Sequence, residues 1–263
     1  MGGVSPDARA DPHGQRGRAP LKVLYICGSG RSGSTIVGDV LGELDGFFHA
    51  GQLRTLWGRS WVGEHLCGCG LPALECAFWS SVFDRALAGG PGPQLDPMEF
   101  DRLREQAVRF RYLPRMLRRS RRHEPLLEPL RTYADAAERL YLAIAEASGA
   151  RIVVDSSKRP ADAALLRSLP NVEPFFLQLV RDPRAVAYSW QRHKPSPGSR
   201  SEEMRRLSPW TSTKYWDLVN LTTEVPPYEM IQLNEHRRRH DPCIGPTLIQ
   251  FQARKMIPVV SIQ

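Results

Sequence analysis

The sequence predicts a single α/β domain in which helices flank a central parallel sheet. Short apolar runs alternate with helix-compatible segments, and this alternation is typical of strand–helix–strand units. The chain has 263 residues, enough to bury one full core. Its 41% hydrophobic and 24% charged residues are those of an ordinary globular protein, which excludes collagen-like, coiled-coil and wholly disordered architectures.

The first elements follow one another from residue 21. Residues 1–20 show no apolar periodicity and are predicted to be a disordered leader. The run LKVLYIC at 21–27 is typical of a strand buried on both faces of a parallel sheet. A glycine-rich turn comes next, and residues 35–44 suit a helix that Asp45-Gly46 ends.

The same alternation continues in the second half of the chain. Apolar residues recur at steps of four and three over 131–148, which predicts an amphipathic helix ending near Gly149. Residues 151–154 and 175–180 are predicted strands, and each leads into a helix. Pro160 suits the first position of one of these helices, and residues 184–193 form the other.

These elements set the expected domain limits. The α/β domain is predicted to cover residues 21–225. The segment 226–263 has scattered polarity without a clear period, so we expect a divergent or poorly ordered tail.

Composition also bears on location and partners. The N-terminus lacks the apolar core of a secretory signal, no apolar stretch reaches the roughly 20 residues of a membrane span, and five cysteines do not suit a secreted disulfide scaffold. We therefore expect a cytoplasmic protein with no membrane span. The net charge of +8 favours anionic partners. Seven arginines within 109–122 allow a nucleic-acid surface, but a solvated basic helix face or a surface toward an acidic acceptor explains them equally well, and we expect no nucleic-acid partner.

The strongest local motif is the turn between residues 28 and 35. Unpaired amides at a helix N-terminus bind anions, and glycines let the backbone approach a ligand closely. The spacing of Gly28 and Gly33 equals that of the nucleotide P-loop, GxxxxGK[ST], although Ser34 stands in the lysine position and Arg31 is the cation within the loop. The alternative is a tight turn that needs glycine only for its geometry.

Two segments together resemble the sulfotransferases that use 3′-phosphoadenosine 5′-phosphosulfate (PAPS). The loop GRSGST at 30–35 is similar to their 5′-phosphosulfate loop, and LVRDPRAVAYS at 179–189 is similar to their 3′-phosphate segment. An arginine fork and a serine hydroxyl are suitable donors for a phosphate dianion. The resemblance implies that the co-substrate is bound by Gly30, Arg31, Ser32, Gly33, Ser34, Thr35, Arg181 and Ser189.

A third set of segments looks like the branch with bacterial and carbohydrate-type sulfotransferases. It comprises residues 49–57, the cysteine segments at 67–70 and 76–79, and VVDSSK at 153–158, so that the resemblance covers about residues 21–222. It implies a P-loop fold and sulfuryl transfer from PAPS, without a required metal, to a hydroxyl or less readily an amine. The acceptor expected from it is a small molecule, a carbohydrate or a lipid.

The catalytic residues predicted from this resemblance are Arg31 and Lys158. Sulfuryl transfer is an in-line displacement, so positive groups that stabilise the leaving phosphate should dominate catalysis. Lys158 follows a predicted strand at the expected active-site edge; the alternative is a surface lysine before a helix.

The general base is left open by the sequence. The family pattern has a glutamate where this chain has Gln52, and glutamine cannot accept a proton. His49, Asp39 or Asp155 could serve instead, the acceptor could already be nucleophilic, or the enzyme could be slow or inactive.

Two other chemistries fit parts of the sequence. Cys67, Cys69 and Cys76, with His65 beside them, suggest zinc, but C-x-C-x6-C is not a standard four-ligand spacing, so we expect a packed or redox-sensitive thiol cluster and no metal site. Asp155 also resembles the magnesium-binding aspartate of a P-loop kinase or NTPase. That function, and a catalytically degenerate nucleotide-binding protein suggested by Gln52 and the tail, are the alternatives.

Overall fold

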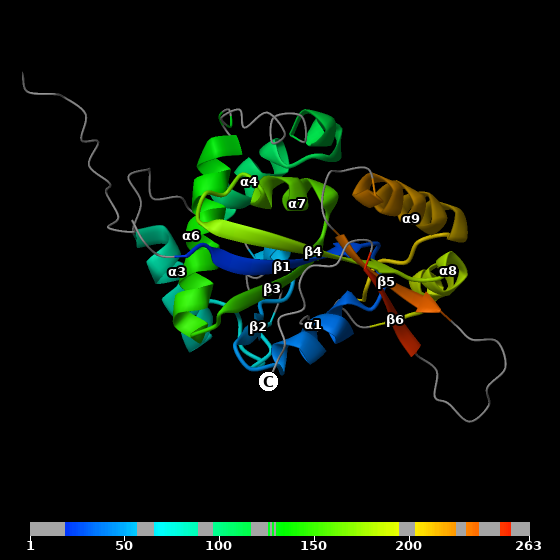
Figure 1. Ribbon diagram of the computed structural model, residues 1–263, viewed down its shortest axis with the longest axis horizontal. Coiled ribbons are helices and arrows are strands. Elements are labelled where there is room, and N and C mark those ends of the chain that lie inside the picture. Colours follow the sequence, from blue (N-terminus) through cyan, green and yellow to red (C-terminus); the bar gives the residue numbers. More distant parts are fainter. Residues whose placement is uncertain are drawn as a thin grey trace, which may run out of the picture.

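The protein contains a six-stranded sheet in the part of the chain that its computed structural model describes (Figure 1). The described residues are 19–56, 66–88, 97–116, 126, 128, 130–194, 203–224, 230–236 and 248–253. The strand order is β2-β3-β1-β4-β5-β6. The strands are β1 (Leu21–Gly28), β2 (Phe47–His49), β3 (Ile152–Lys158), β4 (Val172–Val180), β5 (Met230–His236) and β6 (Leu248–Ala253).

The pairing confirms the predicted α/β class. β2, β3, β1, β4 and β5 pair in parallel, while β6 pairs with β5 in the antiparallel sense at the edge. The helices of four residues or more are α1 (Ser34–Gly42), α2 (Leu53–Leu56), α3 (Ala77–Ala88), α4 (Pro97–Ala107), α6 (Leu130–Ser148), α7 (Pro160–Leu166), α8 (Pro183–Gln191) and α9 (Pro209–Glu224). A short 3-10 helix, η1, covers Phe110–Tyr112.

The side chains of β1 pack into two separate apolar clusters. Val23, Tyr25 and Cys27 join the larger cluster, whose helical members come from α2, α3, α4, α6 and α7. Ile26 belongs to a smaller cluster, against which Val37 and Leu41 of α1 pack. Because successive residues of a strand point to opposite faces, β1 is buried on both sides, as its continuous apolar run predicts.

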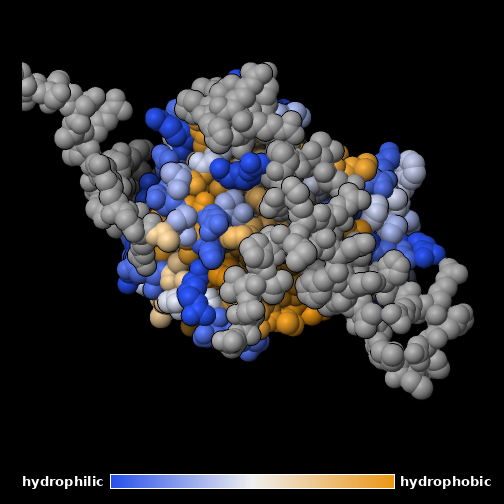
Figure 2. Space-filling view, in the orientation of Figure 1, coloured by the Kyte–Doolittle hydropathy of each residue, from blue (hydrophilic) through white to orange (hydrophobic). Residues whose placement is uncertain are grey.

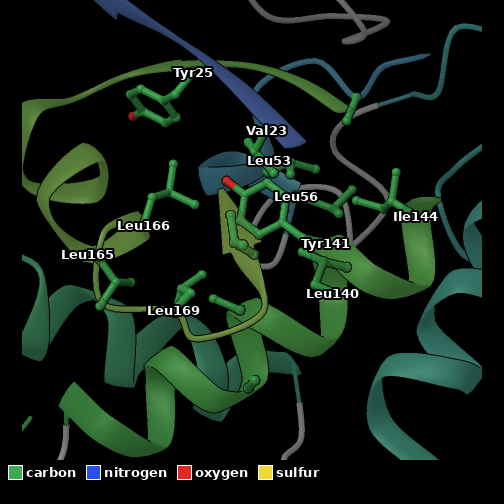
Figure 3. Close-up of a cluster of buried hydrophobic side chains, with 14 of the residues drawn as sticks. Val23, Tyr25, Leu53, Leu56, Leu140, Tyr141, Ile144, Leu165, Leu166 and Leu169 are labelled. Atoms are coloured by element: carbon green, nitrogen blue, oxygen red, sulfur yellow. The ribbon is translucent and has the colours of Figure 1, made fainter. Parts of the chain in front are cut away.

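The larger cluster is the main core of the domain. Figure 3 shows Tyr141 of α6 among leucine side chains, which come from α2 (Leu53 and Leu56), from α6 (Leu140) and from the segment 165–169 (Leu165, Leu166 and Leu169). A cavity of about 30 Å³ lies there, lined by residues that include Leu53, Tyr141, Asp155 and Leu169. It is large enough for about one water molecule and too small for a nucleotide or an acceptor.

The surface is uneven in polarity. Figure 2 shows apolar residues in the region where α1 lies in Figure 1, and α1 exposes Ile36 and Val40. No helix among the described residues is both long and apolar enough to cross a membrane.

Several predicted segments are only partly described. Residues 1–18 of the predicted leader, residues 117–122 of the arginine-rich segment and His65 lie outside the described residues. Strands β5 and β6 come from the segment 226–263 and extend the sheet beyond β4.

The sheet topology brings three strand ends together. Cys27 of β1 is in register with Lys158 of β3, and Gly28 is in register with Leu179 of β4. Because these strands are parallel, the segments that leave them meet along the edge formed by the carboxyl ends of the strands. Ligands of open α/β sheets usually bind there.

Candidate functional site

The loop between β1 and α1 has a backbone that only certain residues allow. Gly28 has φ +142°, and a Cβ there would lie 2.5 Å from the carbonyl oxygen of Leu179 in β4. The closeness of this strand therefore requires glycine at position 28. Gly33 has φ +91° at the N-cap of α1 and provides no side-chain cap. The first amides of α1 therefore lack intrahelical or capping partners and suit an anion.

Arg31 lies in this loop with unused hydrogen-bond donors. Its φ is +69°, its Nη1 lies 2.8 Å from Sδ of Met204, and its guanidinium carbon lies 4.9 Å from the ring centre of Trp190. Its Nε and Nη2 and the Oγ of Ser32 are buried and have no hydrogen-bond partner among the described residues. Burial lowers the pKa of Arg31. Buried donors without acceptors lower the stability of a fold. An anionic ligand in the loop would accept hydrogen bonds from these donors.

Trp190 of α8 holds the loop from one side. A Cβ on Gly30 would lie 2.6 Å from the Trp190 ring, so glycine at this position lets the indole pack against the loop. The same ring carries the Arg31 guanidinium through a cation–π contact. Sequence reasoning did not identify Trp190 or Met204; Trp190 had one signal, its position directly after Ser189, and Met204 had none.

Lys158 reaches the loop from the end of β3. Its Nζ donates to Oγ of Ser34 at 3.1 Å and to the carbonyl oxygen of Ser156 at 3.0 Å. Its backbone has φ +75°, a left-handed conformation that is uncommon for a lysine. Burial lowers the pKa of Lys158 to about 8. The structure thus places an ammonium group at the first residue of α1, although the loop has no lysine of its own.

The predicted 3′-phosphate residues lie beyond β4. Arg181 donates from Nη1 to the carbonyl oxygen of Arg31 at 3.1 Å, and its own carbonyl accepts from Nε1 of Trp216 in α9 at 2.9 Å. Ser189 lies on the buried side of α8. The structure therefore brings Arg31, Ser34, Lys158 and Arg181 to one edge of the sheet and places Ser189 on the helix that follows.

Asp155 is enclosed on the opposite face of the sheet from α1. Its Oδ2 accepts from the Tyr141 hydroxyl at 2.5 Å, and its Oδ1 accepts from the amide and hydroxyl of Ser157 at 2.8 and 2.5 Å. Burial raises the pKa of Asp155 to about 6. Since these donors and the α6 core surround the carboxylate, it is unsuited to act as a general base or a metal ligand at the loop.

His49 joins α1 to β3. Its Nδ1 lies 2.9 Å from Oδ1 of Asp39, and its Nε2 lies 3.1 Å from Oγ of Ser156. A Cβ on Gly38 would lie 2.3 Å from Nε2, so that glycine makes room for the imidazole. The order of groups resembles a Ser–His–Asp triad, but Ser156 is only 1% exposed and donates to the carbonyl of Gly51 at 3.1 Å. Its hydroxyl is therefore not available as a nucleophile.

Gln52 stands at the same sheet edge with its side chain exposed. The preceding Gly51 has φ +73°, and its carbonyl accepts from the Ser156 amide at 2.8 Å. The carbonyl of Gln52 accepts from the amide of Thr55 at 3.0 Å and so begins α2. The segment that carries Gln52 is thus attached to β3 at Ser156, which lies two residues before Lys158.

The fold and these contacts define an α/β domain whose strand ends gather cationic groups and unpaired donors around a glycine loop. A scan of the chain against protein-family models finds no match, and a search among curated proteins finds none either. The chemistry of the site is therefore the basis for proposing a function.

Proposed function

We propose that the protein is a PAPS-dependent sulfotransferase, which moves a sulfuryl group to a hydroxyl of a small-molecule, carbohydrate or lipid acceptor. The observation that carries this proposal is the position of Lys158, whose Nζ lies 3.1 Å from Ser34 Oγ at the start of α1. The nucleotide P-loop places a lysine at the position of Ser34. Here the neighbouring strand supplies the ammonium group to the same point.

The residues of the loop have distinct roles in this proposal. The first amides of α1 and the free donors of Arg31 and Ser32 bind the 5′-phosphosulfate, and Arg181 with Ser189 binds the 3′-phosphate. In the reaction, the bond from sulfur to the bridging phosphate oxygen breaks and a bond from sulfur to the acceptor oxygen forms. Arg31 and Lys158 stabilise the charge that the leaving phosphate gains. The proton of the acceptor hydroxyl passes to solvent water, since Gln52 cannot accept it.

The contacts of Asp155 argue against the kinase or NTPase alternative. A magnesium-binding aspartate needs free carboxylate oxygens at the phosphate loop, whereas those of Asp155 accept from Tyr141 and Ser157. The degenerate alternative is favoured by the exposed glutamine at position 52. We place the activity in the cytoplasm, because the described cysteines are free thiols.

Nucleotide preference tests the proposed function. By calorimetry without magnesium, adenosine 3′,5′-bisphosphate should bind at least tenfold more tightly than 5′-AMP, because only the former has a 3′-phosphate for Arg181 to bind. Losing one charge-assisted contact costs about 1.5 to 3 kcal/mol, so Arg181→Ala should remove most of this preference.

Arg184→Ala is the matched control, because the Arg184 side chain is exposed and pairs with Asp182. It should leave both affinities unchanged. Equal affinities of the wild-type protein for the two nucleotides, or tighter binding of magnesium–ATP, would contradict the proposed function.

The exposed glutamine provides a second test. Gln52→Glu places a carboxylate at the edge where the acceptor hydroxyl is expected, and a general base is worth typically 10² to 10⁴-fold. Turnover of PAPS with a simple alcohol or phenol as acceptor should rise by about tenfold or more, and its pH profile should gain an acidic limb.

Gln106→Glu makes the same charge change on an exposed position of α4 and should not alter the rate. Unchanged turnover in the Gln52 variant, with nucleotide affinity intact, would show that residue 52 does not face the acceptor oxygen.

A further inference from the structure

Three cysteines converge at the beginning of α3, although their spacing in the sequence is irregular. The sulfur atoms of Cys67, Cys69 and Cys76 all lie within 4.8 Å of one another. The Sγ atoms of Cys67 and Cys76 are 3.6 Å apart. A disulfide bond is about 2.05 Å long, whereas two thiolates on one tetrahedral zinc ion, each about 2.3 Å from the metal, are separated by about 3.8 Å. The observed separation is therefore close to that of two ligands of a single metal ion.

The loop that carries the first two thiols is tightly built. The amide of Cys67 donates to the carbonyl of Leu71 at 2.7 Å, and the amide of Gly70 donates to the carbonyl of Cys67 at 2.8 Å. Gly70 has φ +84°, which a residue with a side chain would adopt only with strain. This turn brings the sulfurs of Cys67 and Cys69 to the same side of the loop.

Backbone amides also point at two of the sulfurs. The backbone amide of Cys69 faces the sulfur of Cys67, and the backbone amide of Leu71 faces the sulfur of Cys69. Amide donors stabilise negative charge on sulfur, which a thiolate ligand requires.

The third thiol is fixed by the core. Cys76 is buried and directly precedes α3, its amide donates to the carbonyl of Pro72 at 3.0 Å, and its carbonyl accepts from the Ser80 amide at 2.9 Å. The positive end of the α3 dipole lies at this position. Cys69, in contrast, is exposed, so the cluster is closed toward the core and open toward solvent.

We propose that Cys67, Cys69 and Cys76 bind one Zn²⁺ ion as three thiolates, with the fourth coordination position open to an exogenous ligand on the side of Cys69. Thiolates are the preferred soft ligands of zinc, and each cysteine releases its proton when the metal binds. The ion would fasten the loop 66–72 to the start of α3 and would take no part in the transfer reaction. The site is therefore independent of the function proposed above.

Cobalt substitution tests the metal site directly. When the full-length, reduced protein is titrated with Co²⁺ under anaerobic conditions, we expect one ion per chain, with a thiolate-to-cobalt charge-transfer band and the visible bands of a tetrahedral site. One equivalent of Zn²⁺ should remove both. The absence of a saturable charge-transfer band would overturn the proposal.

Variants identify the ligands. Cys69→Ser changes an exposed side chain, so the fold should persist, while Co²⁺ affinity should fall at least tenfold and the charge-transfer intensity by about one third. Cys27→Ala is the control, because Cys27 is a free thiol of β1 outside the cluster and its removal should change neither quantity. Equal binding by wild type and Cys69→Ser would exclude this site.

Alkylation followed by mass spectrometry tests all three thiols without mutation. Zn²⁺ should slow the alkylation of Cys67, Cys69 and Cys76 together, and a chelator should restore it. A Cys67–Cys76 disulfide that forms with a mild oxidant equally fast with and without Zn²⁺ would instead identify a redox pair and would falsify the metal site.

Discussion

Replacing Lys158 by methionine is expected to lower the turnover of PAPS by about 10² to 10³-fold, the effect of removing one donor from a preorganised anion-stabilising site. Methionine keeps the length of the apolar stem but removes the ammonium group that lies 3.1 Å from Ser34 Oγ. The charge on the leaving phosphate develops mainly in the transition state, so affinity for adenosine 3′,5′-bisphosphate should fall by less than tenfold. Release of that nucleotide measures turnover whichever acceptor is used.

The pH dependence separates charge from shape at this position. The pKa of Lys158 is lowered to about 8, so the ammonium group loses its proton as the pH rises through that value. Turnover of the wild-type protein should decline over this range, whereas Lys158→Arg should keep its charge and lose this limb. Lys22→Met is the control, because Lys22 is the exposed second residue of β1, and it should change neither the turnover nor its pH dependence. If affinity and turnover fell equally in Lys158→Met, the lysine would be a ground-state binding residue.

Removing the buried carboxylate of Asp155 should have the largest effect on stability. Asp155→Ala leaves the Tyr141 hydroxyl and the amide and hydroxyl of Ser157 without their acceptor inside the core. Each unsatisfied buried group costs about 1 to 3 kcal/mol, so the free energy of unfolding should fall by roughly 3 kcal/mol or more. Asp155→Asn keeps an oxygen for Ser157 and should lose about 1 kcal/mol. Urea unfolding measures both.

The pH dependence of the free energy of unfolding tests whether the Asp155 carboxyl is buried. The pKa of Asp155 is raised to about 6 from an ordinary 3.8, so the folded protein binds this proton more tightly than the unfolded chain does. The contribution of this carboxyl to stability is therefore greatest below pH 4 and declines between about pH 4 and 6. Asp155→Asn should remove that decline. An identical pH dependence in wild type and Asp155→Asn would mean that the carboxyl is not buried as described.

The central strands and the glycine loop were predictable because local sequence determines them. β1, β3 and β4 are covered on both faces, and such strands appear as continuous apolar runs. The loop requires glycine at position 28 because a neighbouring carbonyl lies too close for a side chain. The spacing between Gly28 and Gly33 was enough to predict this position. The alternation of a strand also explains Asp155, which points to the same face as Val153 and away from α1.

Other parts depend on tertiary contacts that local patterns do not contain. β5 and β6 lie within the predicted tail. β6 is the edge strand and β5 is next to it, and the β5 sequence MIQLNEH mixes apolar and polar residues without a clear period. The sulfurs of Cys67 and Cys76 meet only because a turn and a helix N-terminus bring them together. The partners of Arg31 are distant in sequence as well. PAPS binding and the functional roles of Arg31, Lys158, Arg181 and Ser189 stay predictions.

The contacts that hold Arg31 in place determine when the anion-binding loop can form during synthesis of the chain. This arginine is bound by Arg181 and Met204, which follow it by 150 and 173 residues. Closing such long loops is entropically unfavourable, so contacts of this separation form late in folding. A chain that is still being synthesised carries its glycine loop from the start, but the arginine is not held in place until more than two hundred residues have been joined. The anion-binding loop therefore matures only after almost the entire described domain exists, which keeps a partial chain from presenting a finished site.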